Sequence, residues 1–356
     1  MEEKSIVYFA VLLDGPKTGA GKKVTDQADT WREMGFKTTI YVVSSQPNVA
    51  EWRKVPGTVV FMEEKGIKKL ILRRSIIQNI SRLRPHVLYV RDSFPFIFPR
   101  IAKSVSIVIE VQTLMRHELF ARNWLRGAQS VLLDWFYLRS ISKFIFVSNE
   151  ISDSNRFKRY LSSRSSIVIS NGIKLDNYSE NKTPAVTPPI EFLFLGQNGQ
   201  KWHGVEQILQ LAKIMPAFVF NIVGVTDLFV NAPSNVIFHG VLKHSEYLPI
   251  AERCVVGIGT LNLSAKGMEE GSSLKVREYL AMGLPVFLRH KDTDFMSPPD
   301  FILEIPNDGN PITDYKNQIV FFSESWVNRR VNRREISKID MKVKETERLK
   351  FIFAES

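Results

Sequence analysis

Two glutamates eight positions apart, Glu270 and Glu278, are the residues of this sequence best placed to act together on one substrate. Small residues follow Glu270, and a helix expected over residues 274–282 begins directly after them. The first turn of such a helix presents unpaired N–H groups that bind phosphate oxygens. Glu278 falls about one turn inside the helix, where a carboxylate can accept two hydrogen bonds from a ribose diol. The pattern predicts a site for a nucleotide-activated donor; a charged helix start with Glu278 in a surface ion pair is the other interpretation.

The elements that must position these residues follow an alternating order. Short β-branched runs alternate with amphipathic stretches in both halves of the chain, which is typical of βαβ units around parallel sheets. We predict an α/β protein with two doubly wound domains, over residues 1–180 and 191–325. A proline-rich linker at 181–190 joins them, and a helical segment at 326–356 could return to the first domain.

Length and composition agree with this organisation. The 356 residues are too many for one typical core and suit two domains. No window reaches the roughly 18 uninterrupted apolar residues of a spanning helix. The start lacks the basic residues and cleavage site of a secretory signal, so we expect none. The single cysteine, Cys254, excludes an internal disulfide and a cysteine-rich metal site, and we expect a cytoplasmic protein.

The net charge of +11 is confined to one half of the chain. Residues 1–180 hold 28 Lys and Arg against 17 Asp and Glu, whereas the remaining residues hold 20 of each. This distribution favours an anionic partner for the first half: a membrane surface, a lipid phosphate or nucleic acid. Basic stretches with apolar and aromatic residues at 65–84 and 116–143 suit a membrane interface, or helices on a sheet with solvated basic faces.

The segment from Glu270 to Val286 resembles, position for position, the Glu-x7-Glu signature of retaining glycosyltransferases of family 4. The similarity includes the following Glu-x-x-Ala-x-Gly-x-Pro-Val, and it is densest in the second half of the chain. Further similar segments are the strand ending at Ser148, the Asn171-Gly172 turn, and the loop from Gly196 to Gly204. Trp202-His203-Gly204 and the string from Ser273 to Tyr279 resemble a subgroup that builds bacterial surface polysaccharides.

This resemblance implies the GT-B fold, in which two Rossmann-like domains face each other across a cleft. It implies transfer of a hexosyl group, with retention, from a nucleotide diphosphate sugar to a lipid-linked or growing glycan acceptor. The nucleotide sugar is then a substrate, and neither a metal nor a cofactor is expected. Glu270 would contact the donor sugar as a catalytic residue and Glu278 would bind the ribose. The other implied donor-binding residues are Gly196, Gln197, His203, Gly271, Ser272, Ser273 and Leu274.

One departure from the family concerns the diphosphate. The family usually has Arg and then Lys in the loop after Gly196, but Gln197 stands at the Arg position here. His203 aligns with the Lys once a one-residue insertion is allowed. We predict that Lys201, two residues away, supplies the charge as a catalytic residue, with His203 as the second candidate. A solvated loop lysine without a role is the alternative for Lys201.

Candidates on the acceptor side come from the first half. The glycine-rich turn at residues 14–23 has the spacing of neither a P-loop nor a dinucleotide fingerprint. It is similar to the family's first loop, so we expect Gly19 and Gly21 to line the cleft; a plain strand-to-helix turn is the alternative. Gln112 occupies the place of a family histidine, and His117 lies nearby in the sequence.

A D-x-D motif, at residues 292–294, could bind a metal in transferases of a different fold. Nothing near it in the sequence has ligand character, and we interpret it as an exposed turn.

The resulting hypothesis is a retaining glycosyltransferase of polysaccharide, capsule or lipopolysaccharide assembly, with its basic first domain able to bind the inner face of the membrane. A nucleotide-sugar epimerase on the same scaffold is one alternative, and it would form product from the donor alone. A basic nucleic-acid-binding protein is another, but no recognised binding motif supports it and no nucleic-acid partner is expected.

Overall fold

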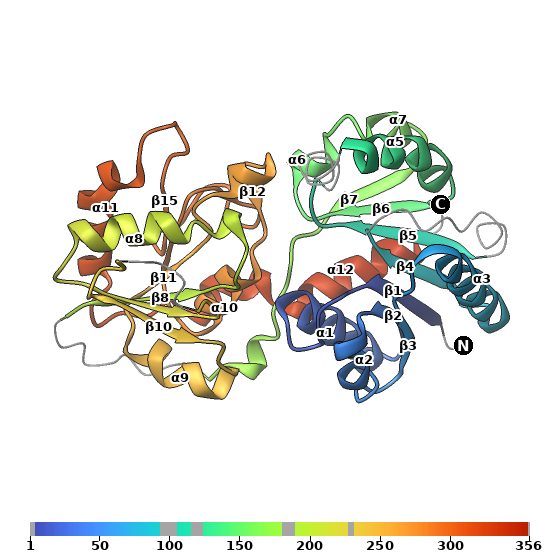
Figure 1. Ribbon diagram of the computed structural model, residues 1–356, viewed down its shortest axis with the longest axis horizontal. Helices are drawn as coiled ribbons and strands as arrows, with labels where there is room; N and C mark the ends of the chain where they lie inside the picture. The colour runs from blue at the N-terminus through green and yellow to red at the C-terminus, as the bar shows by residue number, and fades with distance from the viewer. Residues whose placement is uncertain (1–3, 93–104, 115–123, 180–188, 227–230, 355–356) are drawn as a thin grey trace. The chain divides into compact units, whose positions relative to one another are not determined.

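A computed structural model describes residues 4–92, 105–114, 124–179, 189–226 and 231–354 (Figure 1). The chain forms two compact units. The first unit comprises residues 1–170 together with 341–356, and the second unit comprises residues 171–340.

The first unit is built on a seven-stranded parallel sheet with the strand order β3-β2-β1-β4-β5-β6-β7. Its strands are β1 (Ser5–Val11), β2 (Lys37–Ser44), β3 (Thr58–Met62), β4 (Val87–Arg91), β5 (Ser106–Val111), β6 (Lys143–Phe146) and β7 (Ser165–Val168). The inner strands are buried on both faces, which explains why they read as continuous apolar runs.

The helices of the first unit are α1 (Gly19–Glu33), α2 (Gln46–Trp52), α3 (Gly66–Leu83), α5 (Trp124–Arg139), α6 (Asn149–Ser152), α7 (Lys158–Leu161) and α12 (Met341–Phe353). The hydroxyl of Thr18 caps α1 by accepting a hydrogen bond of 3.3 Å from the Gly21 N–H. A Cβ at Gly21 would lie 2.4 Å from the carbonyl oxygen of Gly15, so only glycine allows the turn after β1 to pack on α1.

Helix α12 completes the first unit through buried polar contacts. Its Glu345 accepts a hydrogen bond of 2.7 Å from the Trp31 indole, and its Arg348 lies 3.3 Å from the carboxylate of Glu110 in β5. At the other end, the ammonium group of Lys143 donates to three carbonyl groups in the last turn and just beyond it. The segment expected at 326–356 therefore divides at residue 340, since only α12 belongs to the first unit.

The second unit contains a six-stranded parallel sheet with the order β10-β9-β8-β11-β13-β15. Its strands are β8 (Glu191–Leu195), β9 (Val219–Val223), β10 (Val236–Gly240), β11 (Val256–Ile258), β13 (Val286–Leu288) and β15 (Ile302–Glu304). A separate two-stranded sheet pairs β12 (Glu270–Gly271) with β14 (Lys291–Asp292).

The helices of the second unit are α8 (Val205–Ile214), α9 (His244–Arg253), α10 (Leu274–Ala281) and α11 (Lys316–Ser325). The 3-10 helices are η2 (Leu175–Asn177), η3 (Lys201–His203), η4 (Leu263–Lys266), η5 (Ile312–Tyr315) and η6 (Arg333–Ile339). Ile173, Leu175 and Tyr178 pack in the core of this unit, so the boundary falls after Ser170 and not at the expected residue 180. Residues 181–188 of the expected linker lie outside the described residues.

Both sheets confirm the predicted pair of doubly wound α/β folds. When the strands of each sheet are numbered from 1 in chain order, both sheets contain the spatial order 3-2-1-4-5-6. The order changes direction next to strand 1, which is β1 in the first unit and β8 in the second. Ligands of such sheets bind outside the carboxyl ends of the strands at this reversal point. In the second unit that point lies between β8 and β11, which directs attention to the loops that follow those two strands.

Candidate functional site

Helix α10 is fixed to the reversal point of the second sheet by Tyr279. The phenol oxygen of Tyr279 accepts a hydrogen bond of 2.6 Å from the N–H of Leu195, the last residue of β8. Its ring packs against β11 at Gly257, where a Cβ would lie 2.4 Å from the ring. Ser273 is the N-cap residue, and its hydroxyl makes no capping hydrogen bond in the described part of the chain. Helix α10 is thus anchored beside β8, and its first turn has no side-chain cap.

Glu278 of α10 is held by two tyrosines that the sequence did not single out. One carboxylate oxygen accepts hydrogen bonds from the hydroxyls of Tyr178, at 2.9 Å, and Tyr247, at 2.5 Å. Burial and then the charge of Glu278 raise the pKa of Tyr247, which keeps it a donor. The two contacts fix the orientation of the carboxylate. The predicted ribose contact of Glu278 stays a prediction, and the tyrosines show how the carboxylate would be presented.

Glu270 lies in the short strand β12, which the ladder to β14 holds in place. Next to it, a Cβ at Gly271 would lie 3.0 Å from the imidazole of His290, so a larger residue would crowd this ring. The Nδ1 atom of His290 lies 3.2 Å from the carbonyl oxygen of Thr260, and a carbonyl oxygen can only accept a hydrogen bond. Nδ1 therefore carries the proton. Burial lowers the pKa of His290, and its ring is neutral at pH 7.

A buried ion pair holds the loop between Glu270 and α10. Arg277 donates to both carboxylate oxygens of Asp292, at 2.7 and 2.9 Å, and to the carbonyl of Asn171 at 3.1 Å. The hydroxyl of Ser272 accepts from the N–H of Asn171 at 2.7 Å, so the side chain of this predicted donor-binding residue positions the loop.

The interpretation of the D-x-D motif as an exposed turn was wrong. Asp292 is buried, and Asp294 lies 2.7 Å from Arg277. The buried guanidinium of Arg277 requires counter-charges in the protein interior, and the two aspartates provide them. Across the residues that the structure describes, no group of three or more His, Cys, Asp or Glu is arranged to hold a metal ion.

The loop after β8 contains the other predicted donor-binding residues. A Cβ at Gly196 would lie 2.4 Å from the Phe194 ring, so this glycine allows a close turn. The N–H of Gln197 donates to Nδ1 of His203 at 3.4 Å. Burial, followed by the charges of Lys275 and Lys266, lowers the pKa of His203 to about 2. His203 is therefore neutral at pH 7 and can offer a phosphate a hydrogen bond but no charge.

Lysines near this loop differ in their exposure. Lys201, the predicted catalytic cation, is exposed in η3. Lys275, the second residue of α10, extends toward β8, and its Nζ atom is buried 4.1 Å from the centroid of the Phe194 ring. The sequence string that carries the family resemblance includes Lys275, but it gives no sign that this side chain turns inward.

In the first unit, the predicted acceptor residues lie at the carboxyl end of the sheet. Gly19 is exposed in the first turn of α1, Gly21 is buried against the preceding turn, and Gln112 is half-buried just after β5. His117 lies outside the described residues.

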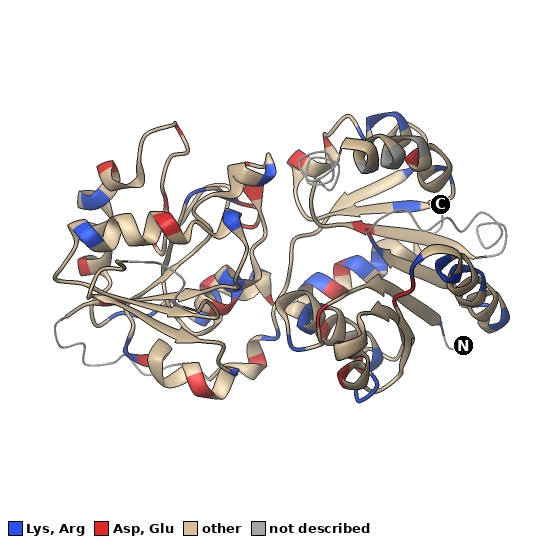
Figure 2. Ribbon diagram, in the orientation of Figure 1, with Lys and Arg blue, Asp and Glu red and all other residues tan. Residues whose placement is uncertain are grey.

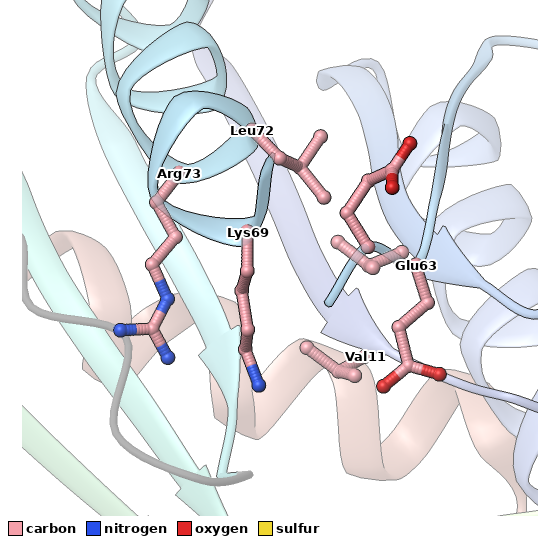
Figure 3. A pocket seen from close by; sticks show the side chains of 7 residues that line it. Val11, Glu63, Lys69, Leu72 and Arg73 are labelled. Atoms are coloured by element: carbon pink, nitrogen blue, oxygen red, sulfur yellow. The ribbon is translucent and has the colours of Figure 1, made fainter. Parts of the chain in front are cut away.

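A pocket at the ends of β1 and β2 lies under α3 (Figure 3). Figure 3 shows Lys69 and Arg73 extending from α3, with Glu63 on the opposite side near Val11. The remaining lining residues are Val43, Glu64 and Leu72.

None of the helices in the described ranges combines the length and apolar character needed to cross a membrane.

Residues 18–177 match the family model described as Glycosyltransferase Family 4. This match lies in the first half of the chain, whereas the sequence resemblance was densest in the second. None of the curated proteins matches the chain.

Solved structures match over nearly the full length. One is sucrose-phosphate synthase from Thermosynechococcus elongatus, with 13% identity, a TM-score of 0.71 and 98% of each chain covered. The lipopolysaccharide outer core galactosyltransferase WaaB, in its apo form, has 12% identity and a TM-score of 0.69, covering 98% of this chain and 99% of that one. The UDP-GlcNAc 2-epimerase from Neisseria meningitidis, bound to UDP-GlcNAc, has 11% identity and a TM-score of 0.56, with 98% and 99% covered.

At these identities the structural likeness establishes the fold alone, and the family model adds the assignment of the first domain. The chain therefore has the GT-B fold, and its residues 18–177 match the model of Glycosyltransferase Family 4.

Proposed function

We propose that this protein is a retaining glycosyltransferase that transfers a hexosyl group from a nucleotide diphosphate sugar to a lipid-linked or growing glycan acceptor. The second unit binds the donor, and the first unit binds the acceptor. The observation that carries the proposal is the arrangement of Glu278 and Glu270 around the first turn of α10. One carboxylate is oriented by two tyrosines, and the other lies on the strand that precedes an uncapped helix start.

The proposed roles follow from what each group can bind. The oriented carboxylate of Glu278 accepts hydrogen bonds from the ribose hydroxyls. The N–H groups and dipole of the first turn of α10 stabilise the diphosphate. Glu270 then contacts the donor sugar. His203, which is neutral, donates a hydrogen bond to the same diphosphate region.

The reaction breaks the bond between the anomeric carbon and the diphosphate oxygen and forms a bond to an acceptor hydroxyl. The proton of that hydroxyl passes to the departing phosphate, so no side-chain base is required. Fixed positive charge around the leaving diphosphate lowers the barrier by electrostatic stabilisation, and it does the task that a metal does in other transferases.

Substitution of the two glutamates tests this assignment. We expect Glu270→Gln to abolish transfer while nucleoside diphosphate binding is retained, and Glu278→Gln to weaken UDP or GDP binding by calorimetry. Glu206→Gln, an exposed residue of α8, is the matched control. A panel of nucleotide sugars screened by thermal stabilisation identifies the donor first. Near-normal transfer by Glu270→Gln would contradict the proposal.

One of the similar structures is a nucleotide-sugar epimerase, so the fold does not exclude the epimerase alternative. Incubation of the purified protein with the donor alone separates the two functions. An epimerase converts the nucleotide sugar into its isomer without an acceptor, whereas the proposed transferase leaves the intact sugar unchanged until an acceptor is added.

We further propose that the first unit binds anionic membranes through the start of α3. The first unit holds 31 Lys and Arg against 18 Asp and Glu. Figure 2 shows basic residues along successive turns of α3. Ile67, Leu70 and Ile71 on this helix are 78%, 63% and 64% exposed, next to Lys68 and Arg74. Exposed apolar side chains among basic ones are typical of helices that lie in a membrane interface.

Vesicle sedimentation tests the membrane proposal. We expect binding to vesicles that contain phosphatidylglycerol, weakened by salt, and little binding to phosphatidylcholine alone. The triple variant Ile67→Ser, Leu70→Ser, Ile71→Ser should bind these vesicles at least about tenfold more weakly, because it removes the inserted apolar area. Phe321→Ser, at an equally exposed apolar residue of the second unit, should have no effect. Equal binding by the triple variant would contradict the proposal.

A further inference from the structure

Several buried cations in the described part of the chain have ion-pair or hydrogen-bond partners within the protein. Arg277 is paired with Asp292, Lys23 with Glu110, and Lys143 with carbonyl groups in the last turn of α12. The ammonium group of Lys275 is buried as well, but no hydrogen-bond acceptor lies within reach of its Nζ atom in the described part of the chain. An ammonium group without a partner in a protein interior is energetically unfavourable, so its position calls for a ligand.

The surroundings of Lys275 are basic and aromatic. The Phe194 ring lies under its Nζ atom, and the charge of Lys275 acts on the imidazoles of both His203 and His290. A second lysine, Lys266, lies near the same loop with its Nζ atom 3.6 Å from the centroid of the Trp202 ring. Burial lowers the pKa of Lys275 well below its usual value. An anion is the ligand that such surroundings favour.

Two further observations place this anion at the diphosphate. Lys275 is the second residue of α10, and the side chain of the N-cap residue, Ser273, does not occupy the N–H groups of that turn in the described structure. The loop after β8 has the uncharged Gln197 at its start. An uncapped helix start and an unpartnered ammonium group on the same turn together form a site for a phosphate group.

We propose that the Nζ atom of Lys275 binds a diphosphate oxygen of the donor and supplies the positive charge that Gln197 does not. This inference rests on the function proposed above, because that function provides the nucleotide diphosphate. Lys275 of α10 thereby takes the diphosphate-binding role that we predicted for Lys201 from the loop sequence. Lys201 is exposed, and a charge in solvent stabilises an anion less than a buried one does.

The test compares Lys275→Met with Lys201→Met and with Lys213→Met, an exposed lysine of α8 that serves as the control. Binding of UDP, GDP, uridine and inorganic pyrophosphate is measured by calorimetry on the full chain. We expect Lys275→Met to weaken UDP or GDP and pyrophosphate about 10- to 100-fold, as for loss of a charge-assisted hydrogen bond. Uridine, which has no phosphate, should bind equally to all variants.

Thermal unfolding without ligand distinguishes binding from a structural role. Methionine keeps the apolar stem of Lys275 and removes an unpartnered buried charge, so Lys275→Met should melt about 2–4 °C higher than the natural protein. Lys275→Gln should show the same loss of phosphate affinity if the methionine variant folds poorly. A lower melting temperature combined with weaker uridine binding would show a structural role and overturn the proposal.

The remaining outcomes are also decisive. Unchanged pyrophosphate and UDP affinity in Lys275→Met, with a loss in Lys201→Met, would return the role to Lys201. If the natural protein binds pyrophosphate through Lys275 but binds no nucleoside diphosphate, the proposed function fails and the anion site stands. If it binds nucleoside diphosphates with no contribution from Lys275, the function stands and the inference fails.

Discussion

The two units of this protein each bury a lysine near the start of a helix, and the two lysines are treated in opposite ways. In the first unit, Lys23 of α1 lies 2.9 Å from the carboxylate of Glu110, and Arg348 of α12 approaches the same carboxylate. In the second unit, Lys275 of α10 lies against an aromatic ring with no acceptor among the described residues.

This difference teaches how a buried charge can be interpreted. A buried pair whose members both belong to the chain fixes the structure, and removal of one partner leaves the other uncompensated. A buried charge without a partner does not stabilise the fold. Its partner then has to come from outside the protein. We therefore expect substitutions around Lys23 to change stability and substitutions around Glu278 and Lys275 to change binding.

The largest effect on stability is expected for Lys23→Met. This variant leaves the carboxylate of Glu110 buried without its lysine, and the free energy of unfolding should fall by about 3–5 kcal/mol. Urea denaturation measures the loss. Adding Glu110→Gln to the same chain should recover part of it, because the uncompensated charge is then removed. A loss below about 1 kcal/mol would show that Arg348 neutralises Glu110 without Lys23.

A somewhat smaller loss of stability is expected at acidic pH. Burial would raise the pKa of Glu110, but Lys23, Arg348 and Arg91 together lower it from 4.5 to about 2. The folded state therefore binds fewer protons than the unfolded state between these values, and stability falls as the pH falls through this window. The loss amounts to about 3 kcal/mol. Urea titrations at several pH values measure it, and Glu110→Gln should be less sensitive to pH over the same range.

The smallest effect is expected for Tyr247→Phe, and it should appear in binding. Loss of one of the two hydroxyls that orient Glu278 should weaken nucleoside diphosphate binding by about 1–2 kcal/mol, roughly 5- to 30-fold. Tyr315→Phe is the matched control, because its hydroxyl also contacts a carboxylate, that of Asp308, outside the site. If Tyr247→Phe lost stability and kept its affinity, the contrast between the two units would fail.

The fold could be predicted from the sequence because its parts have local patterns. Strands buried on both faces, such as β1, β2, β8 and β9, appear as apolar runs in the sequence. The edge strand β3 is only partly buried, so burial shapes its sequence less than that of the inner strands. The return of α12 to the first unit was left open, because its partners Trp31 and Glu110 lie more than 200 residues away in the sequence.

The candidate site was predictable only where a motif carries it. The spacing of Glu270 and Glu278 identified α10 and its first turn. Partners from other parts of the chain, such as Tyr178 and Tyr247, have no sequence signal, because tyrosines are common in cores. The burial of Asp292 depends on the inward orientation of Arg277, which no local pattern shows.

The return of α12 also determines the order in which the protein can be completed during synthesis. The second unit is one continuous stretch of 171–340, whereas the first unit needs a helix that is made after all of it. At about 5–20 residues per second, the ribosome takes about 10–30 s to synthesise the intervening segment. Throughout that interval Glu110 and Trp31 have been synthesised, but their partners Arg348 and Glu345 have not. The unit that begins first is thus finished last, and chaperones have time to meet it in that state.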